Sequence, residues 1–311
     1  TRRSSDLSGL LVSCGWRRCA SAMEMISPTY SMTRSPAAMW HKANTPLPWT
    51  REDWTSIFNA LIFGCCEHVD GFHVSRYAHV SRQFLENTMN VNADFTRKAV
   101  MDTLTLNWEA SPMAGVERKP LDRVGDEVAR ASSIVRYAAG SGYSAHTHGG
   151  GEEILVLEGV FSDEHGHYPA GTYLRNPPGS MHTPFSTDGC TLFVKLRQFH
   201  PADDESVRIN THTAPWYPGL VAGLSVMPLH DFDGVGTALV RWAPNTQFNP
   251  HVHPGGEEIL VLEGVFHDEH GTYPKGTWIR SPRYSRHAPF TQSEGALIYV
   301  KTGHLDYPLT A

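Results

Sequence analysis

The sequence predicts an all-β protein in which two copies of one domain follow each other. From about residue 132 onward, apolar runs alternate with Gly- and Pro-containing turns at a spacing of roughly 8–12 residues, which is typical of a β-sandwich or barrel. Residues 146–182 also recur almost intact at 251–287. Copies of about 105–110 residues can each hold a core of their own, and this period is too long for a solenoid repeat.

The first 88 residues differ in texture from the rest. They show no sustained period of 2 or 3.6, and Asp53 is the best candidate cap for a short helix that would run through Leu61. Met89 then opens a stretch, MNVNADFTRKAV, that reads like a bacterial N-terminus. We therefore interpret residues 1–88 as an extension that is disordered or weakly helical, with a small helical domain as the alternative. The two copies of the domain would occupy 89–200 and 201–311.

Composition excludes several classes of function. A net charge of −6 and the absence of a Lys/Arg stripe argue against a nucleic-acid partner. No apolar run approaches the roughly 20 residues that a membrane span needs, and Leu10–Val12 is too short for a signal-peptide core. We expect a cytoplasmic protein. Its five cysteines form neither a disulfide framework nor a zinc pair, and the histidines of the extension fit no compact zinc spacing.

The repeat defines the expected strands of each copy in order. SSIVRYA aligns with TALVRWA, and the run GGEEILVLEGVF is identical at Gly150–Phe161 and Gly255–Phe266. A DEHG turn and the turns YPAG and YPKG follow, and CTLFVKL matches ALIYVKT near the end of each copy. Each of these runs is short, and turn residues bound it, so that each is expected to form a strand.

Three histidines and one glutamate keep a fixed spacing in both copies. In the first they are His146, His148, Glu152 and His182, and in the second His251, His253, Glu257 and His287. Residues two apart on a strand share a face, so the HxH pair projects its imidazoles together. Three small residues then form a turn, and the glutamate opens the next strand. Neutral imidazoles with one carboxylate suit Zn²⁺, Fe²⁺, Mn²⁺, Ni²⁺ or Cu²⁺.

These segments resemble the two cupin motifs, G(X)5HXH(X)3–4E(X)6G and G(X)5PXG(X)2H(X)3N. The first copy has the leading glycine at Gly140 and the motif-two glycine at Gly179. The second copy has Asn245 and Tyr284 at those two positions. Ser186 and Thr291 stand where each motif would end in Asn. Tyr284 is expected to reshape its turn and to leave the ligands intact.

Among cupins, the run HTHGGGEE…LVLEGVFSDEHG…YPAGTYLRNPPGSMHTPF is similar to ChrR-like cupins, and the resemblance covers about residues 105–311. It implies two jelly-roll (double-stranded β-helix) barrels with one 3-His/1-Glu site each, hence two divalent metal ions per chain, zinc or iron. ChrR-type anti-sigma factors bind their sigma factor through a separate N-terminal domain with an HxxxCxxC motif. Residues 1–88 contain no such motif, so a sigma-factor partner is not expected.

Other duplicated residues receive structural interpretations. Glu153 and Glu258 point to the strand face opposite the ligands, where surface ion pairing is expected. The duplicated cations are likewise expected to pair with carboxylates on an outer face, and the alternative is that they bind an anionic substrate. These cations are Arg136, Arg241, Lys195 and Lys301. We expect exposed hairpin tips at His165 and His270. The duplicated aromatic residues should pack in the core, with pocket lining as the alternative for the last two: Tyr173, Trp278, Phe185 and Phe290.

Several functions remain open at this point. The favoured one is a metal-binding tandem cupin of the ChrR-like type. The alternatives are a non-haem Fe(II) dioxygenase that cleaves a small diketone or hydroxy-ketone, a zinc-dependent sensor without catalysis, and an isomerase or lyase that uses the metal as a Lewis acid. A small-molecule substrate and a homodimer formed through the cupin sheets are the expected partners.

Overall fold

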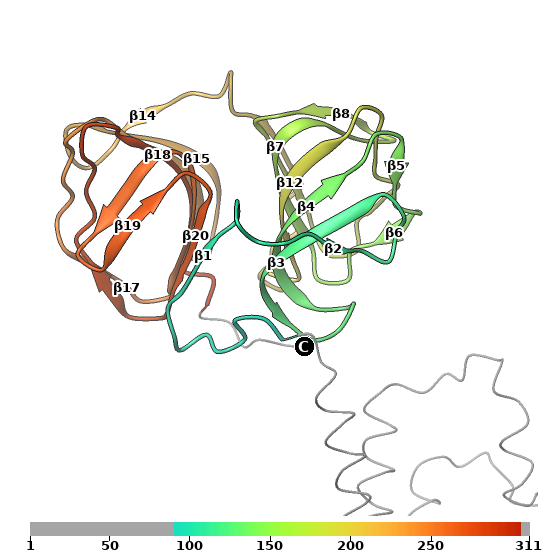
Figure 1. Cartoon of the computed structure of the whole chain (residues 1–311), viewed down its shortest axis with the longest axis horizontal. Coiled ribbons are helices and arrows are strands. Elements are labelled where there is room, and N and C mark those ends of the chain that lie inside the picture. The colour runs from blue at the N-terminus through green and yellow to red at the C-terminus, as the bar shows by residue number, and fades with distance from the viewer. Residues whose placement is uncertain (1–89, 306–311) are drawn as a thin grey trace, which may run out of the picture. The chain divides into compact units, whose positions relative to one another are not determined.

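Two β-barrels make up the part of the chain that the structure, a computed structural model, describes, which is residues 90–305 (Figure 1). No helix occurs among these residues, which confirms the all-β prediction, and none could therefore cross a membrane. The interpretation of residues 1–88, and with it Asp53 and Met89, lies outside the described part.

The first barrel contains the strands from β2 to β12. Their bounds are β2 (Glu109–Ala110), β3 (Val116–Val124), β4 (Arg130–Tyr137), β5 (Ser141–Gly142), β6 (His146–Thr147), β7 (Glu152–Asp163), β8 (Gly166–Pro169), β9 (Thr172–Asn176), β10 (Met181–His182), β11 (Phe185–Ser186) and β12 (Cys190–Leu196). The second barrel contains β14 (Tyr217–Pro218), β15 (Leu224–Phe232), β16 (Val235–Trp242), β17 (His251–His253), β18 (Glu257–Asp268), β19 (Gly271–Pro274), β20 (Thr277–Ser281), β21 (Ser285–His287) and β22 (Ala296–Thr302).

The two barrels have the same topology, as the sequence repeat requires. The large sheet of the first runs β9-β7-β12-β4-β3-β2, and that of the second runs β20-β18-β22-β16-β15-β14, all antiparallel. A small two-stranded pair lies apart from each large sheet: β6 with β10, and β17 with β21. These two small pairs carry the HxH segments.

The barrels exchange one strand each. β1 (Ala99–Asp102) precedes the first barrel in the chain but pairs with β20 of the second, with Ala99 opposite Arg280. β13 (Val207–Asn210) precedes the second barrel but pairs with β9 of the first, with Val207 opposite Arg175. Because Arg175 and Arg280 are equivalent in the repeat, the two additions have the same register. We call β1 and β13 the exchange strands.

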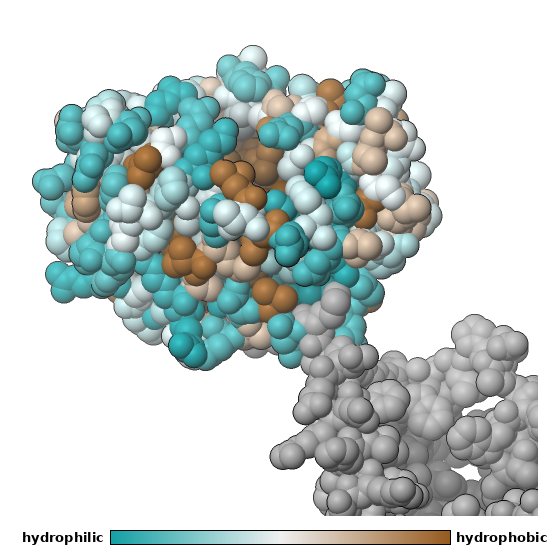
Figure 2. All heavy atoms as spheres, in the orientation of Figure 1, coloured by the Kyte–Doolittle hydropathy of each residue, from teal (hydrophilic) through white to brown (hydrophobic). Residues whose placement is uncertain are grey.

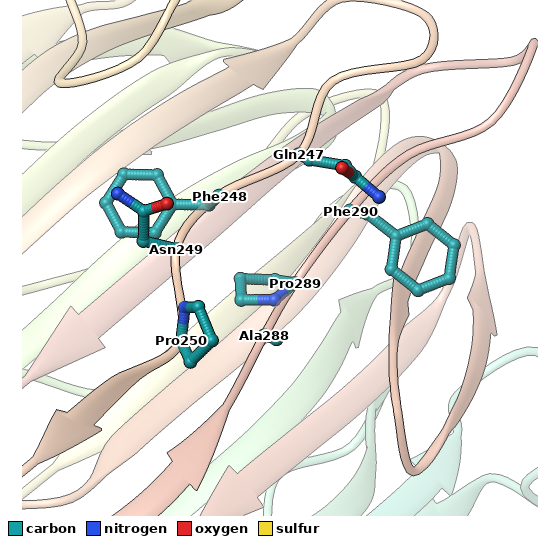
Figure 3. A pocket seen from close by; sticks show the side chains of 7 residues that line it. All are labelled: Gln247, Phe248, Asn249, Pro250, Ala288, Pro289 and Phe290. Carbon is teal, nitrogen blue, oxygen red and sulfur yellow. The ribbon is translucent and has the colours of Figure 1, made fainter.

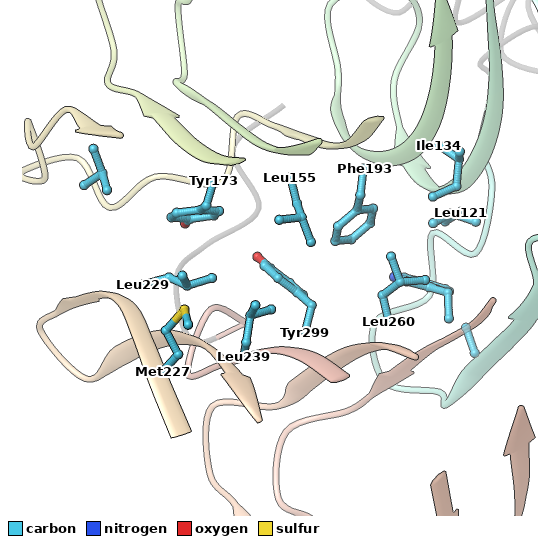
Figure 4. Close-up of a cluster of buried hydrophobic side chains, with 13 residues drawn as sticks. Leu121, Ile134, Leu155, Tyr173, Phe193, Met227, Leu229, Leu239, Leu260 and Tyr299 are labelled. Atoms are coloured by element: carbon cyan, nitrogen blue, oxygen red, sulfur yellow. The ribbon is translucent and has the colours of Figure 1, made fainter. Parts of the chain in front are cut away.

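Apolar side chains fill both barrels and also the space between them. One cluster of buried residues, including Phe161, lies within the first barrel, and an equivalent one, including Phe266, lies within the second. A third cluster joins the two large sheets face to face (Figure 4). There Phe193 of the first barrel meets Tyr299 of the second with ring centroids 5.2 Å apart. The outward faces of the two sheets thus form a single buried interface.

The predicted surface ion pairs of Glu153 and Glu258 are instead buried in this interface. Lys301 donates to Glu153 and Lys195 donates to Glu258, so each pair joins the two barrels. All four residues are at most 1% exposed. The strand-face argument placed them on the correct side of the strand, but the other barrel, rather than solvent, covers that side. The predicted pairing of Lys195 and Lys301 with carboxylates is confirmed, but the prediction that these pairs lie on an exposed face is wrong.

Further polar contacts satisfy the buried charges. Trp278 Nε1 donates to Glu258 over 2.7 Å, and His304 Nε2 lies 3.2 Å from the same carboxylate. Arg280 of the second barrel donates to Asp122 of the first over 3.1 Å. Since removal of a charge from water is costly unless it is paired, these contacts hold the two sheets in one relative register.

The other duplicated side chains divide between core and surface. Tyr173 and Trp278 are fully buried, which confirms core packing, whereas Phe185 is 37% exposed, so core packing is wrong for it. Arg136 pairs with exposed Glu117 over 2.6 Å as expected. Arg241 instead lies over the ring of Trp216, 4.2 Å from its centroid. Figure 2 shows mostly polar side chains on one face, with apolar groups along the seam between the barrels.

The two replaced motif glycines keep the backbone of the glycines. Asn245 has φ +56° where Gly140 has +73°, and Tyr284 has φ +59° where Gly179 has +85°. Nothing lies within 4 Å of a Cβ built on Gly140 or Gly179. Glycine suits these turns because φ is positive, and not because a side chain would lack space. A tyrosine in this conformation is strained.

Candidate metal centres

The first candidate metal centre lies at one end of the first barrel. β6 and β10 pair antiparallel with His146 opposite His182, and His148 and Glu152 flank the three-residue turn that joins β6 to β7. One ligand atom from each of these four residues lies within 4.8 Å of the others. The structure thus brings together the whole set that the sequence proposes for this copy.

Each histidine of this centre is oriented by a contact at Nδ1. The Nδ1 atom of His146 lies 2.9 Å from the carbonyl oxygen of Ser144, and that of His182 lies 3.4 Å from Oδ2 of Asp163. A carbonyl or carboxylate oxygen only accepts, so Nδ1 must carry the proton and Nε2 must present a lone pair. His148 contacts Ser180 Oγ through Nδ1 over 2.9 Å. The Nε2 atoms of His148 and His182 are buried without a hydrogen bond.

Glu152 completes this set as a fixed, ionised carboxylate. Its Oε2 atom lies 3.2 Å from His148 Nε2 and 3.5 Å from His182 Nε2, and it accepts a hydrogen bond of 2.9 Å from Asn176. Burial acts to raise the pKa of Glu152, but the contacts with His148, His182 and Asn176 outweigh it and lower the pKa to about 2. The donor set therefore fits a divalent cation, which would satisfy the two buried nitrogens.

The second candidate metal centre repeats this arrangement with one difference. His251 Nδ1 lies 2.9 Å from the carbonyl oxygen of Asn249, and His287 Nε2 lies 3.1 Å from His253 Nε2 and 3.2 Å from His251 Nε2. Nitrogens that share one metal at about 2.0–2.1 Å would lie about 2.9–3.4 Å apart. Burial lowers the pKa of His253 to about 4, so this imidazole is neutral at pH 7.

Glu257 is held less firmly than Glu152. Its oxygens lie 3.4 Å from His253 Nε2 and 3.7 Å from His287 Nε2, and it is not part of the set whose ligand atoms all lie within 4.8 Å. The position equivalent to Asn176 is Ser281, and burial raises the pKa of Glu257 to about 7. The second centre is thus three histidines with a nearby carboxylate.

Three supporting residues escaped the sequence-based assignment. Asp163 and Asp268 face the Nδ1 atoms of His182 and His287, at 3.4 and 3.6 Å, and Asn176 holds Glu152. The two aspartates belong to the duplicated DEHG turn, so their repetition beside the ligands was the available signal. His165 and His270 in the same turn are exposed, as expected. Asn176 has no counterpart in the second copy and gave no signal.

Two hollows of about 250 Å³ lie near the second centre, one lined by His287 itself and the other by sequence neighbours of His251 and His287. Phe248 and Pro250 line one of them, next to His251, together with Pro289 and Phe290 from the segment after His287 (Figure 3). The expected pocket lining by Phe290 is therefore correct. The other hollow includes Lys98, Asp268 and His287 itself.

Known proteins give a family and a fold for this chain. Residues 96–200 and 204–306 each match the family model described as the ChrR cupin-like domain. Among solved structures, a candidate dioxygenase from Nostoc punctiforme has a TM-score of 0.58 and 15% identity, over 69% of this chain and 86% of that one. Protein Ylba from E. coli has a TM-score of 0.55 and 18% identity, over 73% and 99%. Identities this low show the fold alone. No curated protein matches the chain.

Proposed function

The chain belongs to the ChrR cupin-like family, and on this premise we propose that it is a metal-binding tandem cupin with one divalent ion in each barrel. The ligands would be His146, His148, Glu152 and His182 in the first cupin, and His251, His253, Glu257 and His287 in the second. Zinc or iron is the proposed metal, since imidazole nitrogen with a carboxylate suits both.

The observation that carries this proposal is the orientation of the imidazole rings. In each cupin, protein acceptors engage the Nδ1 side of two histidines and leave the Nε2 lone pairs directed at one another. Without a cation, these two lone pairs and the glutamate carboxylate lie at short range with nothing to offset their repulsion. A metal turns this repulsion into coordination, and the aspartates at Nδ1 make the rings better ligands.

A bound divalent metal would supply Lewis acidity at each centre. The chain's own residues hold that position rigidly. Asn176 donates to Glu152 and orients it, Asp163 keeps the proton of His182 on Nδ1, and the apolar cluster beneath excludes water from the inner side. This arrangement favours tight binding of the metal ion in the first cupin, and tight binding is what a structural or sensing site requires.

The second candidate function, a metal-dependent enzyme acting on a small molecule, is favoured by the second cupin. There the hollow beside His251 is lined by Phe248 and Phe290, which suits an organic substrate such as a small diketone or hydroxy-ketone. Glu257 lies farther from the histidines than Glu152 does, which favours an open coordination position. An Fe(II) dioxygenase is the form of enzyme that we propose as this alternative.

Metal analysis tests the primary proposal. The full chain, purified without added metal, should contain two equivalents of zinc or iron by mass spectrometry. His146→Ala/His148→Ala and His251→Ala/His253→Ala should each retain one equivalent, and the control His165→Ala/His270→Ala, at exposed duplicated positions, should retain two. Metal content that is the same in all four proteins would contradict the ligand assignment. O2 uptake with a β-diketone that is lost only in His251→Ala/His253→Ala would support the alternative.

A further inference from the structure

Two cationic side chains, one on exchange strand β13 and one just before exchange strand β1, reach the metal centres of the opposite cupin. Arg208 on β13 precedes the second barrel in the chain, yet its Nη2 atom donates to Oδ1 of Asn176 over 2.6 Å. Lys98, next to β1, precedes the first barrel, yet its Nζ atom lies 3.2 Å from Oδ2 of Asp268. Asn176 and Asp268 are the residues that hold Glu152 and His287, respectively.

We propose that each metal centre is completed by a positioning residue supplied by the other half of the chain: Arg208 for the first centre and Lys98 for the second. This inference rests on the proposed function, because it concerns how tightly and in what geometry those centres bind a metal ion.

Arg208 acts by fixing the orientation of the Asn176 amide. A guanidinium only donates hydrogen bonds, so the oxygen of Asn176 must face Arg208. The amide nitrogen is then turned toward Glu152, to which it donates over 2.9 Å. Asn176 and Glu152 are 4% and 8% exposed, so water offers little competition. Without Arg208 the amide is free to flip and to place its oxygen against the carboxylate, which would push Glu152 out of position.

Lys98 acts on the aspartate behind His287. Its ammonium contacts Asp268 and also donates to the hydroxyl of Tyr273 over 2.8 Å, while that hydroxyl donates to Asp268 over 2.9 Å. The carboxylate is thereby held in one orientation, 3.6 Å from Nδ1 of His287. The first cupin keeps the Tyr168 contact to Asp163, 3.0 Å, and there the exchange-strand cation, Arg208, lies over the Tyr168 ring, 5.7 Å from its centroid, and donates to Asn176.

The two positions are specific to their own centres. The strand registers make Arg208 equivalent to Val100, and Lys98 equivalent to Ser206. Neither equivalent residue could perform the role of its counterpart, because valine donates no hydrogen bond and serine carries no charge. Asn176 is likewise Ser281 in the second copy. The two centres therefore depend on different residues, and each can be perturbed alone.

The test measures zinc affinity at one centre at a time in the full chain. His251→Ala/His253→Ala isolates the first centre and His146→Ala/His148→Ala isolates the second, with a chromophoric chelator as competitor. Arg208→Met should weaken the first centre by about 10–100-fold and leave the second unchanged, and Lys98→Met should do the reverse, since loss of a partner behind a ligand has effects of this size. Val100→Ala is the matched control and should change neither affinity.

Two further readouts separate positioning from a general role in folding. Asn176→Asp keeps a partner for Arg208 but removes the donor to Glu152, so it should weaken the first centre as much as Arg208→Met. With Co²⁺ in place of zinc, the visible absorption bands of the affected centre alone should shift. A change below about twofold, equal losses at both centres, or an Asn176→Asp protein with unchanged affinity would overturn the inference. If His251→Ala/His253→Ala and His146→Ala/His148→Ala bind no zinc at all, the proposed function is contradicted as well as this inference.

Discussion

Lys301 of the second cupin donates to the carboxylate of Glu153 in the first, and both side chains are at most 2% exposed. Lys195 and Glu258 repeat this pair in the opposite direction. Two reciprocal ion pairs are therefore buried within the apolar cluster between the cupins, in addition to the pair of Arg280 and Asp122.

Removal of one partner of such a pair should be strongly destabilising. Lys301→Met removes the nearer of the two cations at buried Glu153 and leaves Arg175, 3.6 Å away, as the other, so we expect the free energy of unfolding to fall by about 3 kcal/mol. The double variant Lys301→Met/Glu153→Gln should recover part of this loss. Chemical denaturation checks both. The control Arg136→Met removes an exposed pair and should cost less than about 1 kcal/mol. Equal losses for Lys301→Met and Arg136→Met would contradict a buried pair.

Acid should weaken the same interface in two steps. Burial lowers the pKa of His304 from an ordinary 6.5 to about 3. The nearby cations of Lys195 and Lys301 also lower this pKa, and the contact with Glu258 only partly opposes the change. Between these pH values only the unfolded chain binds the proton, so stability falls as the pH drops below about 6.5. Burial also opposes ionisation of Glu153, but Lys301 outweighs it and lowers its pKa, so further stability is lost below about 4.5.

The contribution of His304 to the first step can be measured. The midpoint of urea unfolding of the metal-free protein should decrease between pH 7 and pH 5, and this slope should be smaller in His304→Gln. An equal slope in the two proteins would exclude His304 as its source.

The strained turn at Tyr284 predicts a stabilising substitution. Because a residue other than glycine pays about 1–2 kcal/mol in the left-handed region, Tyr284→Gly should raise the free energy of unfolding by about 1 kcal/mol. Gly179→Ala should lower it by a similar amount, since the conformation, and not the space, requires glycine there. Thermal unfolding of both variants checks the pair. A destabilised Tyr284→Gly would show that the exposed ring makes contacts worth more than the strain.

Metal removal should lower thermal stability. A ligand that binds only the folded state stabilises it by about 2.7 kcal/mol when its concentration is 100 times its Kd. Treatment with a chelator should therefore lower the melting temperature, and zinc should restore it. His148→Ala/His253→Ala, which lacks one ligand in each cupin, should melt at a temperature that responds weakly to either treatment. A melting temperature of the native chain that is insensitive to chelator would argue against occupied centres.

The sequence predicts the barrels and the convergence of the ligands because both are local consequences of strand periodicity. His146 and His148 share a strand face, and Glu152 opens the next strand, so three of the four ligands are set within seven residues. His182 then arrives through the β6–β10 pairing. The proposed ligand set of the first centre depends on little else.

The interface could not be predicted in the same way. Alternation along a strand indicates only that Glu153 points away from the barrel interior. The same alternation results whether solvent or a second sheet covers that outer face. The buried Lys195 and Glu258 lie 63 positions apart in different cupins, so no local pattern connects them. The exchange of β1 and β13 is equally non-local. The expectation of a homodimer through the cupin sheets remains a prediction, although those sheet faces already meet within one chain.

The reciprocal exchange has a consequence for how such a chain can arise. β1 and β13 add to opposite sheets in one register, which is the geometry of a symmetric domain swap. Two separate chains of one cupin each could close the same arrangement around a two-fold axis, and duplication of the gene would join them end to end. Fusion makes this association independent of protein concentration, and it also frees the two halves to diverge, as Arg208 and Lys98 already have.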